Sequence, residues 1–233
     1  DRLKLVGDYY YKTTDPLLIT IDMPSSSGAT NNQIYKNFGK QTSKGFTGQV
    51  SYYIIRELKK RFWWSVRGTL RTGTSKLSGI GNQLESFNSK EREGENKSTK
   101  RYYDGANPDA IWAVRSAGID PATGREIFIK KDGTTTYDFS YDDEVIIANS
   151  RPKIEGVLGT SLSWKGFSIN ADFRYRMGGY SFNSVLFNKV ENISTSSLIY
   201  NQDKRALYDR WQKPGDQAQF KNIANSTSTP MSS

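Results

Sequence analysis

Apolar and polar side chains alternate strictly over residues 167–177. The apolar positions are Phe167, Ile169, Ala171, Phe173, Tyr175 and Met177. The polar positions between them are Ser168, Asn170, Asp172, Arg174 and Arg176. Because successive side chains of a β-strand point to opposite faces, this pattern predicts a strand with one apolar face and one strongly polar face.

The same alternation recurs in four other segments. Residues 154–164 are separated from the strand above only by Lys165 and Gly166, which predicts a hairpin with a two-residue turn. The other segments are residues 2–12, 45–55 and 62–72, and each of the five is 11 residues long. Strands of soluble proteins usually have about 5–6 residues, whereas strands that cross a membrane in a barrel need about 9–11. Strand length therefore favours a barrel wall over a soluble sandwich.

The connections between these segments alternate between long and short. Residues 13–44, 73–153 and 178–233 are long stretches, whereas residues 56–61 and 165–166 are short turns. In an up-and-down sheet all the long connections emerge at one end, which is the asymmetry of outer-membrane barrels with short periplasmic turns and long extracellular loops. Aromatic residues lie beside both short turns, as an interfacial aromatic girdle requires: Phe62, Trp63, Trp64, Trp164 and Phe167.

The composition is compatible with this interpretation and excludes several others. Mean hydropathy is −0.69, and no apolar run approaches the roughly 20 residues that a spanning helix needs. A barrel wall tolerates such a value, because half of each strand and all the long loops face water. The chain has no His and no Cys, which excludes Ser-His-Asp and Cys-His catalysis, disulfides and Cys/His zinc sites. The 13% aromatic content argues against a disordered chain.

The net charge of +9 comes from 33 Lys and Arg against 24 Asp and Glu in 233 residues. The positive residues are spread over strands and loops without a dense basic stripe, so we expect no nucleic-acid partner. The acidic run at residues 141–144 lacks the ligand spacing of a calcium loop, and no cofactor or metal site is predicted.

Short motifs in consistent order resemble the SusC/RagA family of TonB-dependent outer-membrane transporters from Bacteroidetes. Residues 8–18 resemble a barrel strand of the family, and residues 37–46 resemble the entry to the next strand. Residues 118–128, Gly-Ile-Asp-Pro-Ala-Thr-Gly-Arg-Glu-Ile-Phe, are similar to its most recognisable loop motif. Residues 151–167 resemble the following hairpin, and residues 203–216 resemble a late extracellular loop.

The resemblance implies an all-β fold: a segment of a large antiparallel transmembrane β-barrel, with 22 strands in the family. Residues 1–233 would be a later part of one barrel domain, without the plug and the closing strands. The whole protein would import a large nutrient, an oligosaccharide or a peptide, through the outer membrane. The implied partners are TonB, reached through the absent plug, a SusD-like surface lipoprotein that covers the extracellular mouth, and the surrounding outer-membrane lipid.

The candidate site residues fall into two groups, and none is predicted to be catalytic. Those expected to face the barrel lumen are Gln49, Arg67, Arg71, Asn170, Asp172, Arg174 and Arg176. Each of these could contact substrate or pack against the plug. Aromatic residues expected to contact substrate or the lipoprotein lid from the loops are Tyr102, Tyr103, Trp112, Tyr180 and Trp211. They could stack on sugar rings or fill contacts within the protein.

Two other classes of function remain open from the sequence alone. A soluble all-β carbohydrate-binding module would show the same alternation, with core and solvent in place of lipid and lumen. A glycosidase would need two carboxylates about 5–9.5 Å apart, and the sequence places no such pair.

Overall fold

The computed structural model describes residues 2–22, 33–37, 39–82, 84–85, 87–89, 101–193 and 199–223. These residues belong to two compact units. The first contains the described residues up to Ser89, together with Arg101–Asp109 and Asn149–Tyr180. The second contains Ala110–Ala148 and the described residues after Tyr180. No helix in the described part of the chain is long and apolar enough to cross a membrane.

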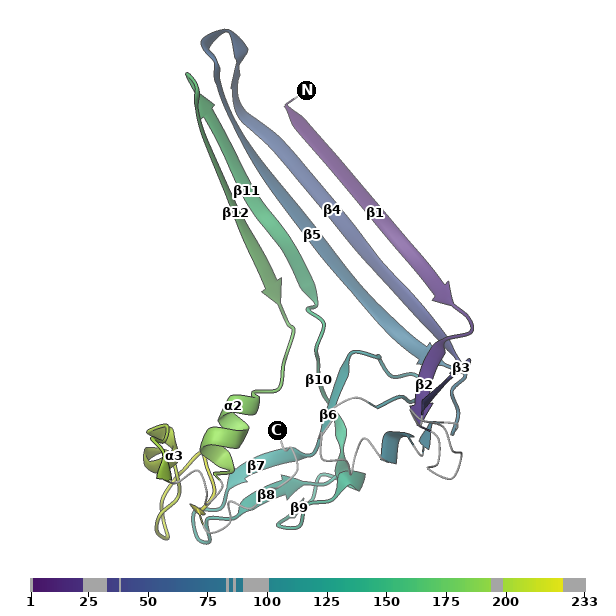
Figure 1. Cartoon of the computed structure of the whole chain (residues 1–233), viewed down its shortest axis with the longest axis vertical. Helices are drawn as coiled ribbons and strands as arrows, with labels where there is room; N and C mark the ends of the chain where they lie inside the picture. Colours follow the sequence, from purple (N-terminus) through teal and green to yellow (C-terminus); the bar gives the residue numbers. More distant parts are fainter. Residues whose placement is uncertain are drawn as a thin grey trace. The chain divides into compact units, whose positions relative to one another are not determined.

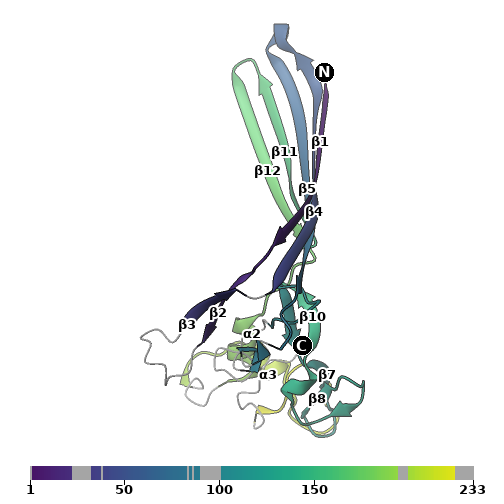
Figure 2. The same cartoon turned by 90° about the vertical axis from the view of Figure 1, so that its right-hand side faces the viewer.

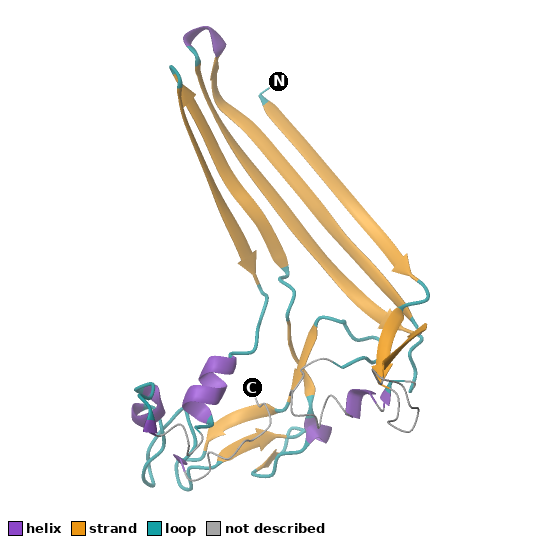
Figure 3. Cartoon of the chain, in the orientation of Figure 1, coloured by secondary structure: helices purple, strands orange, loops and turns teal. Residues whose placement is uncertain are grey.

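One antiparallel sheet of five long strands dominates the first unit (Figure 1). Its order is β1-β4-β5-β11-β12, with bounds Leu3–Thr14, Lys40–Glu57, Phe62–Ser78, Ile154–Trp164 and Phe167–Met177. The strands run side by side in both views, and Figure 2 presents the sheet from the side. The two hairpin turns lie at the same end of the sheet, as Figure 3 makes clear from the orange strands. The structure therefore has the fold of a barrel wall segment.

The two short turns connect the strands in different ways. Lys165 and Gly166 have φ values of 47° and 98°, the two positive angles that a type I′ hairpin turn requires. A 3₁₀ turn, Leu58–Lys60, joins β4 to β5. Trp164 pairs with Phe167 beside the first turn, and Glu57 pairs with Phe62 beside the second. The aromatic side chains thus lie at the turn end of the sheet, as the sequence predicts.

The bounds of β11 and β12 are those predicted, whereas the other three strands are longer. β1 begins and ends later than residues 2–12, and β4 and β5 extend well beyond residues 45–55 and 62–72. Past Thr72 the face that carries the charges nearer the turns becomes buried, at Ser75 and Leu77. Leu77 lies on the face that is polar elsewhere, yet it is fully buried with Ile80 and Leu84. The alternation of apolar and polar residues therefore ends before β5 does. For this reason the sequence pattern did not predict the last residues of the strand.

A β-bulge interrupts the pairing of β4 with β5. Tyr53 pairs with Ser65 and Ile55 pairs with Trp64, so Ile54 is an additional residue. The uninterrupted alternation predicted for residues 45–55 is therefore wrong at its end. The bulge sets Tyr53 against Trp63, with ring centroids 6.4 Å apart, and Arg56 over the Tyr53 ring. Trp63, which breaks the polar pattern of its strand, finds an aromatic partner there.

Two further parts complete the first unit: segment 101–109, which pairs with the end of β5 away from the turns, and a hairpin that follows β1 in the chain. Segment 101–109 pairs with the strand through hydrogen bonds between Leu77 and both Gly105 and Ala106. The Asp104 carboxylate accepts hydrogen bonds from the backbone N–H groups of Ile80 and Gly81, which lower its pKa. A separate hairpin is formed by β2, Leu18–Asp22, and β3, Gln33–Asn37.

The second unit contains the shorter elements. β6, Ala110–Ala113, pairs with β10, Val145–Asn149, and a three-stranded sheet consists of β7, Arg115–Ile119, β8, Glu126–Ile129, and β9, Thr135–Thr136. The helical segments are η3 Tyr141–Asp143, α2 Ser184–Leu186, η4 Phe187–Glu191 and α3 Arg205–Tyr208. The stretches 73–153 and 178–233, predicted as loops, therefore contain a folded unit with its own core around Val190, Ile193 and Phe220.

Candidate functional site: the charged face of the sheet

Cross-strand register separates the side chains of the sheet into two chemically different faces. One row joins Leu5, Val50, Gly68, Leu158 and Phe173, and the adjacent row joins Lys4, Ser51, Arg67, Gly159 and Asp172. On the first face Leu5 is 69% exposed and Phe173 is 70% exposed. We call this the apolar face and the other the charged face. All seven residues predicted to face a lumen belong to the charged face.

Arg67 on β5 and Asp172 on β12 form an ion pair across the intervening strand. The Arg67 Nη2 donates to both carboxylate oxygens of Asp172, at 2.7 and 2.6 Å. Gly159 on β11 lies between them, and a Cβ there would overlap the Asp172 carboxylate and the Arg67 side chain. A glycine at this position is what lets the two side chains meet. Both side chains are about half exposed, so the pair contributes at most about 1 kcal/mol to stability.

Three arginines surround one carboxylate farther along the charged face, away from the turns. Glu155 on β11 lies 4.0 Å from Arg71, 3.8 Å from Arg174 and 3.6 Å from Arg176. Glu155 is 27% exposed, while all three arginines are more than half exposed. One negative charge cannot neutralise three positive ones. The cluster therefore keeps a charge of +2, and its guanidinium groups remain available to an anionic group.

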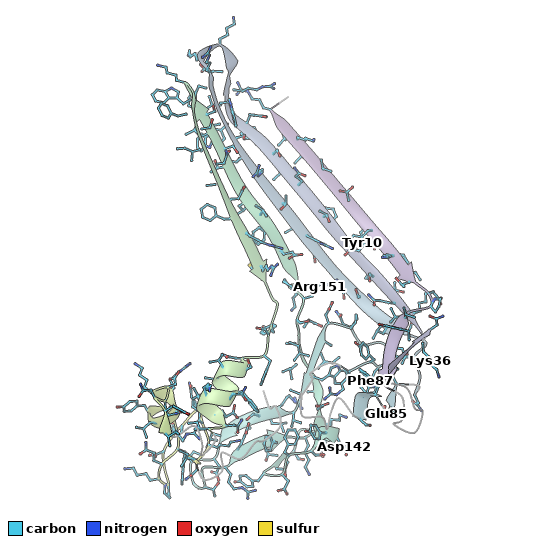
Figure 4. The ribbon with its side chains drawn as sticks, in the orientation of Figure 1. Tyr10, Lys36, Glu85, Phe87, Asp142 and Arg151 are labelled. Atoms are coloured by element: carbon cyan, nitrogen blue, oxygen red, sulfur yellow. The ribbon has the colours of Figure 1, made fainter. Side chains whose placement is uncertain are left out.

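A small hollow of about 180 Å³ opens beside this cluster, between Tyr10, Arg71, Arg151 and Glu155. Figure 4 labels Tyr10 on β1 and Arg151 just before β11. The Tyr10 hydroxyl lies over the backbone of Gly45 and Gly73, where a side chain at either glycine would overlap it. Arg151 is held by Asp109, with 3.2 Å between Nε and Oδ2. The hollow combines a phenol and two guanidinium groups, which are donors suited to carboxylate oxygens.

The remaining two predicted residues add neutral polar groups to the same face. Gln49 pairs with Thr69 and Asn170 pairs with Ser161, and both side chains are exposed. The sequence reasoning missed Glu155, Arg151 and Tyr10. Glu155 could have been found, because the two-residue turn fixes the hairpin register and sets Glu155 opposite Arg176. Arg151 lies outside any strand and gave no periodic signal.

The five candidate aromatic residues of the connecting segments lie in different surroundings. Tyr102 is half-buried against Phe87, with ring centroids 5.6 Å apart, and packs on the Leu77 cluster. Tyr103 and Trp112 are half-buried, and Tyr180 is 60% exposed. Trp211 is buried inside the second unit. Of these side chains Tyr180 is the one most accessible to a partner, and Tyr102 and Trp211 have structural contacts.

Trp211 stabilises the turn at residues 120–125. The Asp120 carboxylate accepts hydrogen bonds from the Thr123 hydroxyl at 2.6 Å, the Ala122 N–H at 3.0 Å and the Tyr137 hydroxyl at 2.9 Å, and these lower its pKa. Gly124 has φ of 69°, and the Trp211 ring lies where its Cβ would be. The indole N–H donates to the Pro121 carbonyl at 2.9 Å. Asp120, Thr123 and Gly124 thus each have a local structural role in this turn.

The described residues contain no group of three or more acidic, His or Cys side chains that could hold a metal ion. The acidic run at residues 141–144 begins with the turn η3, where the Ser140 side chain accepts a hydrogen bond from the Asp142 N–H and Asp143 accepts one from the Lys131 N–H.

Comparison with known proteins places the sheet in a larger structure. No family model matches the chain. A TonB-dependent receptor P3 of Formosa agariphila is 27% identical over 204 residues, which are 80% of this chain and 20% of that protein. The solved structure of the RagAB peptide transporter superposes on 96% of this chain and 24% of its own, with a TM-score of 0.75 and 23% identity. The chain is thus similar in sequence to a segment of a TonB-dependent receptor and has the fold of a segment of the RagAB transporter.

A second solved structure supports the same placement. The RagAB peptide importer in the closed-closed state covers 95% of this chain, with a TM-score of 0.72 and 24% identity. The chain spans about a fifth to a quarter of the length of the proteins that it matches. Its five-stranded sheet is accordingly an arc of a β-barrel, and the predicted fold class and resemblance are confirmed.

Proposed function

We propose that this segment forms part of the wall of an outer-membrane transporter that imports large nutrients. The apolar face contacts lipid hydrocarbon and the charged face lines the lumen. The single observation that carries the proposal is the opposition of the two faces across five long paired strands. Open sheet edges are not tolerated in hydrocarbon, so the wall is completed by further strands.

The lumen-facing charges favour peptides over neutral oligosaccharides as the substrate class. Arg71, Arg174 and Arg176 share one carboxylate, and the residual charge of +2 attracts carboxylates. Peptides carry carboxylates at their C-terminus and on acidic side chains, whereas neutral sugars carry none. The solved relatives are a peptide transporter and a peptide importer, which supports this choice. The polar side chains of Gln49 and Asn170 would add hydrogen bonds to the peptide backbone, which do not depend on the amino-acid sequence of the substrate.

The partners follow from the resemblance. Import would be driven through TonB, and a SusD-like lipoprotein would cover the extracellular mouth. Tyr180 is the best candidate for a contact with this lid or with substrate, because its side chain is largely exposed. Tyr103 and Trp112 are weaker candidates, since both are half-buried. We propose no catalytic role for any residue.

A soluble carbohydrate-binding module is the alternative that the sequence left open. Such a module would expose single apolar side chains, but rarely a continuous apolar patch larger than a few hundred Å². Here the apolar face carries many exposed large side chains on adjacent strands. They include Leu3, Leu5, Tyr9, Leu158, Phe167, Ile169, Phe173 and Met177. This surface favours the membrane assignment.

The test is peptide uptake by cells that express the complete native protein with Arg71→Gln and Arg176→Gln. We expect uptake of an acidic peptide to fall about tenfold through a higher KM, since two partly exposed charge contacts are each worth somewhat less than 1 kcal/mol. Uptake of a neutral peptide of equal length should be unchanged. The matched control is Arg2→Gln with Arg61→Gln at the turn end of the sheet. An equal loss for both peptides, or no loss for either, would refute the proposed role of the arginines.

A further inference from the structure

The apolar face carries two neighbouring hollows that the proposed transport path does not use. The first, which we call the rim hollow, has a volume of about 570 Å³ and lies where β11 separates from β5. Tyr9, Lys44 and Phe46 line it from the strands, and Asn149, Arg151 and Lys153 line it from the segment before β11. Tyr9 pairs with Phe46 on the apolar face, and Lys44 lies on the same face two residues farther from the turn end.

The rim hollow is positively charged at the margin of the apolar surface. Arg151 is paired with Asp109, but Lys44 and Lys153 form no ion pair with any residue that the structure describes. Both lysine side chains are exposed. The hollow therefore keeps a charge of +2 beside two aromatic rings. Aromatic residues with adjacent cations are typical of the level where lipid headgroups meet hydrocarbon.

Asn149 supplies a second, independent sign of a ligand. Its side-chain oxygen is shielded from solvent and accepts no hydrogen bond within the described part of the chain. A buried acceptor without a donor is unfavourable by about 1–3 kcal/mol. A hydroxyl group in the rim hollow would donate to this oxygen. A sugar headgroup carries such hydroxyls, whereas a bare phosphate dianion carries none.

The second hollow, which we call the glycine hollow, lies on the same face and has a volume of about 530 Å³. Gly7, Gly48 and Gly68 leave it without side chains, and its walls include Leu5, Leu70 and Leu158. The Phe46 ring borders both hollows, because it lies 3.5 Å from a Cβ placed at Gly7 and 3.1 Å from one placed at Gly48. Aliphatic side chains and glycines make up most of its lining, with Gln49 and Thr69 as polar members. A mainly apolar trough next to a cationic headgroup-sized hollow has the form of an acyl-chain site.

We propose that the two hollows together bind one phosphorylated glycolipid of the outer leaflet. Its phosphate lies between Lys44 and Lys153, a sugar hydroxyl donates to Asn149, and an acyl chain lies in the glycine hollow against Phe46. This inference rests on the proposed orientation of the apolar face toward lipid. It means that the rim hollow and the glycine hollow bind one specific lipid, whereas the rest of the apolar face contacts bilayer lipids without selection.

The experiment is native mass spectrometry of the complete native protein in detergent. The protein is titrated with lipid A, a phosphorylated disaccharide lipid, and with its dephosphorylated form. Lys44→Gln with Lys153→Gln should weaken binding of the phosphorylated lipid about 25-fold, from a factor of about five for each lysine near a phosphate. Binding of the dephosphorylated form should not change. The matched control, Lys59→Gln with Lys165→Gln at the turn end, should change neither by more than about twofold.

A second variant tests the acyl-chain part of the site. Gly7→Val fills the glycine hollow with a β-branched residue that suits a strand, and it should weaken both lipid forms equally. Equal binding of the two forms to the parent protein, or no effect of the lysine changes, would overturn the proposal. The proposal would also be overturned if inorganic phosphate bound with the same dependence on the two lysines while the lipid did not bind. Failure of the membrane orientation itself is recognised separately, through the Phe173 and Asn170 pair described below.

Discussion

Phe173→Arg is the change that most directly tests the assignment of the two faces. Phe173 lies on the apolar face of β12, opposite Leu158, and is one residue from the middle of Phe167–Met177. An 11-residue strand is about 36 Å long, and a tilt of about 45° gives it a height of about 25 Å, the thickness of the apolar band of a barrel. Phe173 is therefore about 2 Å from the midplane of the membrane.

An arginine at this depth on the lipid side is unfavourable by about 2–4 kcal/mol, which is a factor of roughly 30 to 1,000 in the folding equilibrium. Asn170→Arg places the same side chain on the charged face of the same strand, opposite Ser161, and should change stability by less than about 0.5 kcal/mol, as ordinary surface substitutions do. The assay is urea unfolding of the complete native protein in lipid vesicles, followed by tryptophan fluorescence. Phe173→Leu controls for loss of the ring.

Depth provides a second comparison on the same strand. Ile169 lies three residues from the strand centre, about 7 Å nearer the turn end, so Ile169→Arg should be less destabilising than Phe173→Arg. Ser168→Arg, on the charged face, should be tolerated. Equal losses for Phe173→Arg and Asn170→Arg, or a larger loss for Asn170→Arg, would refute the face assignment and the membrane proposal with it.

Three further changes test local features. Gly159→Val would overlap the Asp172 carboxylate and should destabilise the sheet by about 1–3 kcal/mol in the same unfolding assay, whereas a change confined to transport would contradict this. Trp211→Ala removes the ring that covers Gly124 and should cost about 3–5 kcal/mol, measured as faster hydrogen exchange at the turn, and unchanged exchange would contradict the packing. Burial raises the pKa of Glu191 above 4.5, so the stability from its protonated form is fully present below pH 4.5 and is lost as the pH rises through the raised pKa. Glu191→Gln should remove that pH dependence of exchange in the second unit, and an unchanged pH profile would contradict it.

The hairpin of β11 and β12 could be predicted from sequence because two local signals agree there. Alternation marks the faces, and the two-residue turn at Lys165 and Gly166 fixes the register. The ends of β4 and β5 away from the turns could not be predicted from sequence. There segment 101–109 covers Leu77 on the face that is polar nearer the turns. That burial depends on residues distant in sequence. The bulge at Ile54 escaped detection for a related reason, since a single inserted residue resets the alternation.

The charged site was predicted in part for the same physical reasons. Arg67, Asp172 and Arg176 follow from alternation alone, and their face is as expected. The meeting of Arg67 with Asp172 depends on Gly159 in a strand between them, and only the pairing of β5 with β11 brings that glycine into place. Trp211 was expected at a surface, but its burial against Gly124 depends on a contact between distant segments of the second unit.

The order of strands in the sheet has a consequence for how the chain folds. The hairpins β4–β5 and β11–β12 close over short turns, whereas the contact between Arg67 and Asp172 joins residues 105 apart in the sequence. Closing so large a loop has a higher entropic cost, and non-local pairing slows folding. The two hairpins should therefore form first and independently, and their zipping along β5 and β11 should be the slow step of assembly. Until that step is complete, the edges of β5 and β11 that will pair are open to other strands, so a chaperone that shields strand edges would be of most use at this stage.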